Sequence, residues 1–247
     1  MNLKRIKLNF SQKGFVVIRK IFDKKKINEL LKDLENVKVK AQKTKNNKYF
    51  HKTKDGKINT IHNINIFHKK GEVINATKNP KLRSIVEKLI EDKVKLRNIE
   101  FFLKPKKTGM ESPFHQDNFY WNIKKAKAVN VWIACSKSSK KNGGLCYYES
   151  SNKLGTIKHE ISFMKGSSQK IPNEVLKNLS FKKKFPVLNR GDCLIHHPEV
   201  IHGSFQNKSK YNRVGLVVSF RGLNSRIDIA KLNEYKKNLK KNLSRFY

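Results

Sequence analysis

Apolar residues near the start of the chain recur at the spacing of a helix. After Asp23, the positions Ile27, Leu30, Leu31 and Leu34 follow one another at intervals that place them on one face of an α-helix. Asp is a favoured N-cap residue, because its carboxylate accepts a backbone N–H of the first turn. The pattern therefore predicts a helix that begins after Asp23 and buries its apolar face in the core.

The segments around this helix show other patterns. Residues 15–18 are apolar and predict a strand, residues 38–57 are Lys-rich and polar and predict a loop, and the alternation over residues 58–67 predicts a second strand.

The dipeptide Asn79-Pro80 combines a capping residue with the proline that is favoured in the first turn of a helix. An apolar stripe at helical spacing follows it, so a second helix is expected there.

Short β-rich runs separated by turn residues replace the helical patterns from Val94 onward. They cover residues 94–103, 129–135, 145–148, 193–196 and 214–220. Such a succession of strands is typical of a barrel or jelly roll. We therefore expect a mainly β protein with flanking helices, folded as one domain over residues 1–247. Its parts are helical support mainly over 20–92, a β core over about 94–222 and a C-terminal tail over 223–247.

The chain carries a formal net charge of +37, which would ordinarily suggest a polyanionic partner. However, Lys outnumbers Arg several-fold and is scattered along the chain together with abundant Asn and Ile. Recognition surfaces for phosphate favour Arg, whose planar fork binds two oxygens at once. The composition resembles the codon bias of an AT-rich genome more than a nucleic-acid groove, and we expect no specific nucleic-acid partner.

Cysteine usage and the N-terminal sequence indicate the compartment. The three cysteines Cys135, Cys146 and Cys193 are widely spaced among apolar neighbours, so neither a disulfide framework nor a zinc knuckle is expected. No apolar segment follows the charged first residues, and no run approaches the length of a membrane span. We expect a cytoplasmic protein without a membrane span. The sequence leaves the oligomeric state open, and a monomer is compatible with it.

Two distant segments combine into a candidate metal site. His115 and Asp117 are two residues apart, so on a strand their side chains point to the same face and can hold one ion. The third ligand would be His202, brought alongside on another strand. Two imidazoles and one carboxylate leave three positions open on a metal, the arrangement that suits non-haem Fe(II). His-x-Asp alone is a weak signal, and the surroundings of His202 strengthen it.

Arg213 opens the apolar run 214–220, which reads as a buried strand. A guanidinium at the start of a core strand needs an anion. Its fork fits a carboxylate, which the far end of a dicarboxylic cosubstrate such as 2-oxoglutarate would offer while its keto-acid end chelates the iron. Ser204, two residues after His202, would add a hydroxyl hydrogen bond.

The motifs and their order resemble one enzyme family. They comprise Lys13-Gly14-Phe15, Pro113-Phe114-His115-Gln116-Asp117, Val131-Trp132-Ile133-Ala134, Asn142-Gly143-Gly144, Ser150-Ser151-Asn152-Lys153, Gly191-Asp192, and His202-Gly203-Ser204 with Arg213. The chain resembles the phytanoyl-CoA dioxygenase (PhyH) family of Fe(II)- and 2-oxoglutarate-dependent oxygenases. It departs from the family where Ser150-Ser151-Asn152-Lys153 replaces a frequent Gly-Ser-His-Lys, a difference that affects only substrate-side contacts.

The resemblance implies the fold, the cofactors and the roles of several residues. It implies a double-stranded β-helix, a cupin-like jelly-roll barrel, that binds Fe2+ and uses 2-oxoglutarate and O2 as cosubstrates. It assigns His115, Asp117 and His202 as iron ligands, and Arg213, Ser204 and Trp132 to the 2-oxoglutarate site. The implied reaction is hydroxylation of a small molecule with release of succinate and CO2. Because related halogenases lack the carboxylate ligand and Asp117 is present, we expect hydroxylation and not halogenation.

Other polar residues are candidates for substrate contact. Gln116, Asn118 and Tyr120 flank the metal ligands, while Asn63 and Lys104 belong to a strand and a loop near them. Basic residues around Lys104 would attract an anionic substrate, although a solvated basic rim explains them as well. For His159, His196 and His197 we favour packing or rim positions over functional ones.

Two other classes of protein remain open at this point. A cupin-type barrel, either an isomerase or a ligand-binding protein, would bind a metal without 2-oxoglutarate. A basic nucleic-acid-binding protein would use the net charge, with a steep dependence of binding on salt. Arg213 discriminates the first alternative from the oxygenase, because only the oxygenase needs a cation for a cosubstrate carboxylate.

Overall fold

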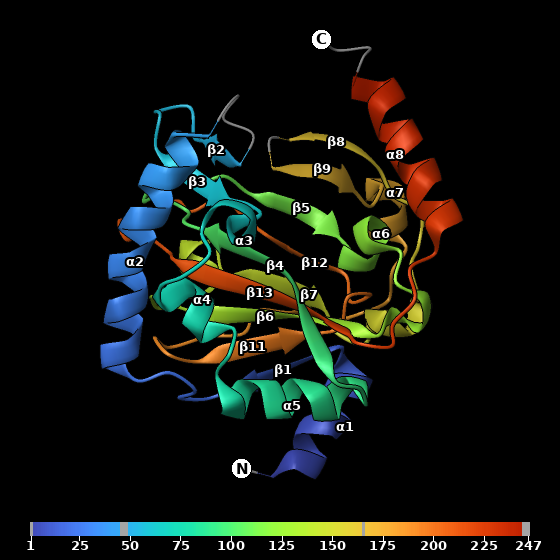
Figure 1. The fold of residues 1–247 in the computed structure, drawn as a ribbon. Coiled ribbons are helices and arrows are strands. Elements are labelled where there is room, and N and C mark those ends of the chain that lie inside the picture. Colours follow the sequence, from blue (N-terminus) through green and yellow to red (C-terminus); the bar gives the residue numbers. More distant parts are fainter. Residues whose placement is uncertain (1, 45–48, 165, 244–247) are drawn as a thin grey trace.

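The computed structural model describes residues 2–44, 49–164 and 166–243. Its helices lie mostly before the β core and after it (Figure 1). They are α1 (Leu3–Lys13), α2 (Lys24–Gln42), α3 (Ile64–Phe67), α4 (Glu72–Ala76), α5 (Pro80–Ile90), α6 (Asp117–Trp121), α7 (Asn173–Lys177) and α8 (Ile229–Leu243), with short 3-10 turns η2 (Lys124–Ala126), η3 (Lys140–Asn142) and η4 (Ser151–Leu154). None of these helices is long and apolar enough to cross a bilayer.

The strands form two larger antiparallel sheets and one hairpin. The larger sheet has the order β1 (Phe15–Ile18), β11 (Cys193–His196), β6 (Ala128–Ala134), β13 (Gly215–Gly222), β4 (Val94–Phe102), β3 (Ile58–Ile61) and β2 (Phe50–Lys52). The smaller sheet has the order β10 (Lys183–Lys184), β7 (Leu145–Tyr148), β12 (His202–Ser204) and β5 (Ser112–His115). The separate hairpin is β8 (Glu160–Met164) with β9 (Ser167–Lys170).

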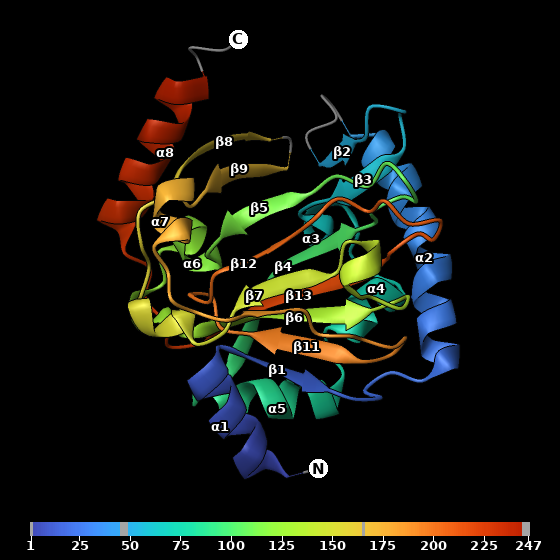
Figure 2. The same cartoon turned by 180° about the vertical axis from the view of Figure 1, so that it is seen from behind.

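The two sheets face each other as the two walls of a jelly roll, which confirms the expected fold class. Figure 2, turned by 180°, brings β7 of the smaller sheet in front of β13 of the larger one. A buried cluster that includes Phe15, Trp132, Tyr147 and Val217 fills part of the space between the walls. The outer face of the larger sheet packs against the helices through a second, larger cluster. Alternate residues of each central strand therefore serve two different cores.

Both helix N-termini expected from the sequence are confirmed by their capping hydrogen bonds. The carboxylate of Asp23 accepts the backbone N–H of Lys26 at 2.7 Å. The side-chain oxygen of Asn79 accepts the N–H of Leu82 at 2.9 Å, and Pro80 is the first residue of α5. Local capping chemistry thus fixed these two boundaries.

Two expectations about the flanks of the core were wrong. The strand expected over residues 58–67 ends at Ile61, because Asn63 adopts a left-handed backbone (φ 54°) and the chain then turns into α3. The loop expected over 38–57 contains the end of α2 and strand β2. The C-terminal tail contains the helix α8, an element for which no prediction was made. The sequence reading also missed α1, which buries Ile6 and Phe10.

Gly191 ties the chain just before β11 to the chain that follows β1. Its carbonyl oxygen accepts the backbone N–H groups of Ile21 and Phe22 at 3.0 and 3.1 Å, and its own N–H donates to Ala134 at 2.8 Å. Its φ of +89° lies in the region that favours glycine, and a Cβ at this position would overlap the carbonyl oxygen of Phe22.

We therefore expect Gly191→Ala to lower the free energy of unfolding by more than the ~1–3 kcal/mol of backbone strain alone. Gly56→Ala is the matched control, because Gly56 has a φ of +80° and no atom within 4 Å of the point that a Cβ would occupy. Urea unfolding of both variants measures the difference. Equal losses in the two variants would contradict the packing role of Gly191.

Candidate metal centre

His115, Asp117 and His202 come together at one end of the smaller sheet. His115 ends β5 and lies directly opposite His202, which begins β12, in the antiparallel register of these strands. Asp117 is the first residue of α6. The Nε2 atoms of His115 and His202 lie 3.8 and 3.9 Å from Oδ1 of Asp117, and the three ligand atoms lie within 4.8 Å of one another. This is a compact donor set for one metal ion.

The route by which His115 and Asp117 reach the same side differs from the expected one. Both were expected on one strand, but β5 ends at His115 and Asp117 already belongs to α6. Gln116 between them keeps an extended backbone (φ −122°, ψ 131°), so the strand's alternation continues for one more residue. The two side chains therefore share a face across a strand-to-helix junction.

The tautomers of both histidines are set by the backbone two residues earlier in the chain. Nδ1 of His115 lies 2.7 Å from the carbonyl oxygen of Pro113, and Nδ1 of His202 lies 3.1 Å from that of Val200. A carbonyl oxygen only accepts, so each Nδ1 carries the proton and each Nε2 presents a lone pair. Such outer hydrogen bonds orient histidine ligands in metal sites.

The carboxylate of Asp117 is held so that one oxygen remains for a metal. Its Oδ2 accepts hydrogen bonds from Nδ2 of Asn130 at 2.6 Å and from Nε2 of His196 at 2.9 Å. The other nitrogen of His196, Nδ1, is bonded to the hydroxyl of Tyr147 at 2.9 Å. Oδ1 is thereby left facing the two histidine ligands.

His196 therefore has a role that the sequence reading missed, since a packing or rim position was expected for it. The sequence of its strand could have indicated this role. His196 is two residues after Leu194, so the alternation of a strand directs both side chains toward the inner face of the sheet. Asn130 was also missed. Asn130 on β6 lies directly opposite His196 on β11, so the two residues that bond to Oδ2 of Asp117 are neighbours in the sheet.

Burial and neighbouring charges prepare these groups for a cation. Burial lowers the pKa of His115 and of His202 to about 4. Burial alone would raise the pKa of Asp117, but His202, His196 and His115 around it lower that pKa below its usual range. Neutral imidazoles and an ionised carboxylate are the protonation states that a metal ion requires.

A second feature of the barrel interior is a buried guanidinium without a protein anion. Arg213 is 1% exposed, and no described residue forms a hydrogen bond or ion pair with its guanidinium. The group lies over the ring of Trp132, with 5.3 Å from Cζ to the ring centroid. Burial lowers the pKa of Arg213 to about 9. Since an unpaired buried charge is costly, this position calls for an external anion.

Lys104 and Ser204 extend this cationic position. Lys104 is 1% exposed, and its Nζ donates to Oγ of Ser204 at 2.7 Å and to the carbonyl oxygen of Phe205 at 2.6 Å. Burial is the main cause that lowers the pKa of Lys104 well below its ordinary value, and the positive charge of Arg213 lowers it further. The structure thus places Lys104, which was expected near the substrate, together with the proposed cosubstrate residues Arg213 and Ser204.

The amides of Gln116 and Asn118 are committed to the surrounding loops. Gln116 is completely buried; its Nε2 donates to the carbonyl oxygens of Gly155 and Glu199, and its Oε1 accepts the N–H of Ile157. Asn118 accepts the N–H of Ile123 at 3.0 Å and donates to the side chain of Glu199 at 3.1 Å. These contacts make both residues positioning elements for the loops around Asp117, and the contact with substrate expected for them stays a prediction.

Tyr120 and Asn63 occupy different surroundings. The ring of Tyr120 lies edge-on to His115, with centroids 5.8 Å apart, and its hydroxyl donates to the carbonyl oxygen of Gln169 on β9. Asn63 is exposed at the start of α3 and has no described contact with the metal ligands. His159 accepts the N–H of Gln116 at 2.9 Å, so it has the structural role favoured from the sequence.

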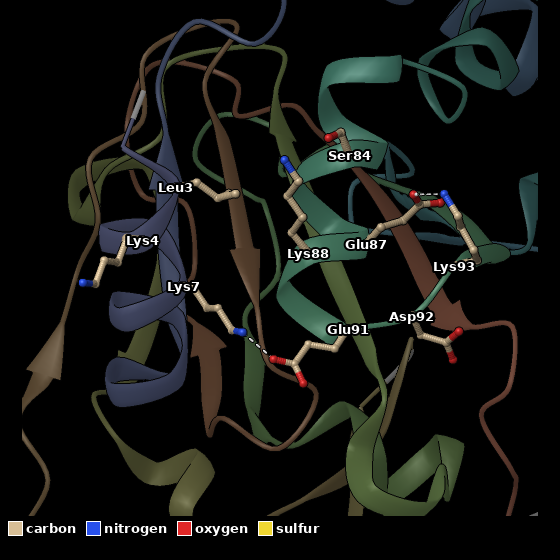
Figure 3. A pocket seen from close by; sticks show the side chains of 9 residues that line it. All are labelled: Leu3, Lys4, Lys7, Ser84, Glu87, Lys88, Glu91, Asp92 and Lys93. Atoms are coloured by element: carbon tan, nitrogen blue, oxygen red, sulfur yellow. Dashed lines mark hydrogen bonds and ion pairs between the residues drawn. The ribbon is translucent and has the colours of Figure 1, made fainter.

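A surface groove between α1 and α5 lies apart from these residues (Figure 3). Two ion pairs lie along it, Lys7 with Glu91 and Lys93 with Glu87. The groove contains none of the metal or guanidinium residues described above. It is therefore not a candidate for the functional site.

The fold and the site define a jelly-roll protein with a two-histidine, one-carboxylate metal centre. A sequence profile of the Phytanoyl-CoA dioxygenase (PhyH) family matches residues 10–215, and the chain belongs to this family.

Comparison with individual proteins gives more distant similarities. The chain is 28% identical to human peroxisomal phytanoyl-CoA dioxygenase over 122 residues, which is 47% of this chain and 36% of that protein's length. The crystal structure of EctD from S. alaskensis with 2-oxoglutarate and 5-hydroxyectoine has a TM-score of 0.74 at 17% identity, covering 91% of this chain and 77% of that one. The epimerase SnoN, solved with Fe3+, alpha ketoglutarate and nogalamycin RO, has a TM-score of 0.72 at 15% identity, with 91% and 85% covered. These structures share the fold.

We expect Asn130→Ala to weaken Fe(II) binding by about 10- to 100-fold, the usual effect of losing a partner that orients a ligand. The variant removes one of the two hydrogen bonds to Oδ2 of Asp117 and leaves every ligand in place. Anaerobic Fe(II) titration measures the affinity. Asn59→Ala is the control, because Asn59 is also a buried amide but accepts the N–H of Met110. Equal Fe(II) affinity in the two variants would contradict the role of Asn130.

The stability of the metal-free protein should fall as the pH is lowered from about 6.5 toward 4. The pKa values of His115, His159, His197 and His202 are each lowered to about 4, with burial as the largest cause. The unfolded imidazoles, with a pKa of about 6.5, bind protons first, so acid favours the unfolded state within this window. Urea midpoints at about pH 7, 6 and 5 test the trend, and a constant midpoint across them would contradict it.

Proposed function

We propose that the protein is an Fe(II)- and 2-oxoglutarate-dependent dioxygenase that hydroxylates an aliphatic C–H bond of a small molecule. The observation that carries the proposal is the buried guanidinium of Arg213 beside Lys104, which has no anion among the described residues. A metal site alone would not require these cations. A cosubstrate that chelates the metal at one end and carries a carboxylate at the other requires both.

The metal ligands have defined tasks in this proposal. His115 and His202 would bind Fe(II) through Nε2, and Asp117 through Oδ1, since Asn130 and His196 engage its other oxygen. Fe(II) and 2-oxoglutarate, when bound there, would supply the activation of O2 and the oxidative decarboxylation that yields succinate and CO2. A set of only three protein ligands suits a metal ion that must also bind a cosubstrate.

The cations and the indole ring would hold the far end of the cosubstrate. Arg213 offers a planar fork for the distal carboxylate, and Lys104 adds a second positive charge on the side of Ser204. Trp132, under the guanidinium, limits how far that group can move. These residues therefore orient 2-oxoglutarate and exclude water from its carboxylate.

The proposed reaction is hydroxylation because the carboxylate ligand is present in Asp117. The fold alone does not decide the reaction, since similar folds belong to an epimerase and to EctD, solved with 5-hydroxyectoine. A cupin-type isomerase or binding protein would account for the metal ligands but would leave Arg213 unpaired. A nucleic-acid-binding function would not use a guanidinium that is 1% exposed. The cytoplasmic location remains a prediction.

We expect purified protein with Fe(II), 2-oxoglutarate and O2 to release succinate, and Arg213→Met to raise the KM for 2-oxoglutarate about 100-fold. That size corresponds to the loss of charge-assisted hydrogen bonds worth roughly 1.5–3 kcal/mol each. Succinate is measured in the absence and presence of a metabolite panel, with Asp117→Ala as the blank. Binding is followed separately through the visible absorption of the Fe(II)–keto acid chelate under argon.

The matched control is Arg190→Met, because Arg190 is exposed and bonds to Asn28 on the surface. It should leave the KM unchanged. If the wild-type protein binds Fe(II) but gives no chelate absorption with 2-oxoglutarate, the dioxygenase proposal is wrong and a cupin-type function is favoured.

A further inference from the structure

Strand β4 carries an irregularity next to the metal site. Its pairing with β13 runs from Asn98 opposite Ser219 directly to Leu96 opposite Phe220, so Arg97 is the extra residue of a β-bulge. A bulge bends the strand and redirects side chains, and bulges are frequent beside active sites. Arg97 is therefore the residue that breaks the alternation of β4, while Asn98 stays paired with Ser219.

The bulge directs Arg97 toward the helix that begins with a metal ligand. Its guanidinium lies over the ring of Trp121 in α6, with 4.5 Å from Cζ to the centroid. Burial lowers the pKa of Arg97 to about 10, while the charges of Glu100 and Asp117 oppose this shift and that of Arg221 adds to it. Arg97 is therefore a partly desolvated cation within electrostatic reach of the metal ligand Asp117.

The donors of Arg97 are unused in the described part of the chain. No hydrogen bond joins its guanidinium to a described residue, and no carboxylate there lies within 4 Å of it. Asp117 cannot serve as its partner, because Oδ2 is occupied by Asn130 and His196 and Oδ1 faces the metal position. A stacked guanidinium with free donors is a prepared site for an anionic group.

Glu100 lies near Arg97 on the same strand and supplies the opposite charge. Its side chain is 20% exposed, and only Oε1 is used, accepting from Asn98 at 3.0 Å and bonding to Nδ1 of His62 at 2.8 Å. No described residue bonds to Oε2. The charge of Glu100 also acts on His115, which places the carboxylate within electrostatic reach of the metal site as well.

Arg97 and Glu100 act on each other electrostatically but form no ion pair. Because the two side chains do not bond to each other, the guanidinium N–H groups of Arg97 and Oε2 of Glu100 have no hydrogen-bond partner among the described residues. A ligand with only an anionic group would satisfy Arg97 and leave the free oxygen of Glu100 unused, and a ligand with only a cationic group would do the reverse. A ligand with both groups would neutralise both without adding net charge to the barrel interior.

We infer that the substrate of the proposed dioxygenase is a small zwitterion of the amino-acid type, whose carboxylate binds Arg97 and whose ammonium group binds Glu100. This inference rests on the proposed function. The two charges fix the molecule at two points beside Asp117, so that a C–H bond of its carbon skeleton faces the metal. Arg97 and Glu100 thus determine which molecules bind, and they leave the affinity for 2-oxoglutarate to Arg213 and Lys104.

Matched sets of small molecules test the inference. One set is proline, its acid analogue cyclopentanecarboxylate and its amine analogue pyrrolidine; the other is norvaline, pentanoate and butylamine. Binding to the Fe(II)·2-oxoglutarate form is measured under argon by the change in chelate absorption, and succinate release is measured in air. We expect at least one of the two zwitterions to bind at least 10-fold more tightly than both of its analogues.

Variants assign the two ends of the ligand. Arg97→Met should lower the affinity for the zwitterion at least 10-fold and abolish its advantage over the amine, with partial recovery in Arg97→Lys. Glu100→Gln should abolish the advantage over the acid. Arg83→Met is the control, because Arg83 also lies over an aromatic ring, that of Phe220, but on helix α5, and it should change neither affinity.

The outcomes separate the two proposals. If the wild-type protein gives neither chelate absorption nor succinate, the dioxygenase function itself fails. If it gives both, and no zwitterion in either set binds better than its analogues or Arg97→Met retains the preference, the inference about the substrate is wrong while the dioxygenase function stands. Absence of binding by every compound counts against the inference in the same way.

Discussion

The metal centre depends on one buried carboxylate that is held from three directions. Asn130 and His196, from adjacent strands of the larger sheet, bond to one oxygen of Asp117, and the histidines of the smaller sheet face the other. Asp117 therefore connects the two walls of the barrel. Because burial opposes its negative charge, the carboxylate stays ionised only through the hydrogen bonds and imidazoles around it. The strand order of the two sheets brings these four residues around the carboxylate of Asp117.

The barrel interior also contains buried cations that form no ion pair with a described residue. Arg213 and Lys104 are close enough to affect each other electrostatically and form no ion pair with a described residue, and Arg97 stacks on Trp121 with its donors free of described partners. In a protein with a net charge of +37, exposed lysines carry little information. A buried guanidinium does, because its desolvation must be offset by something that binds there. The functional argument therefore rests on a few buried charges and not on the overall charge.

Much of the site was accessible from the sequence, because its signals are local. His115, Asp117, His202 and Arg213 were found from residue type, spacing and the apolar strand after Arg213, and the helix starts at Asp23 and Asn79 followed from capping chemistry. The features that were not predicted depend on the pairing of strands that are far apart in the sequence. His196 and Asn130 meet only through the register of β11 with β6, and the bulge at Arg97 appears only when β13 is laid against β4.

The errors at the edges of the core have a similar origin. Residues 58–67 alternate like a strand, but a single left-handed residue, Asn63, turns the chain into a helix after Ile61. Gln116 and Asn118 were expected to contact substrate from their position beside the ligands, and their amides form hydrogen bonds with the loop backbone of residues 155, 157, 123 and 199. Such long-range satisfaction of polar groups leaves no local trace in the sequence.

Both histidine ligands are oriented by the carbonyl oxygen two residues earlier in the chain, Pro113 in β5 for His115 and Val200, just before β12, for His202. Each imidazole is thus aligned by a self-contained three-residue unit that travels with its strand. The loops that follow the two strands can change in length and composition without rotating either ring. In such a barrel, substrate selectivity can diverge under selection while the affinity for the metal is preserved.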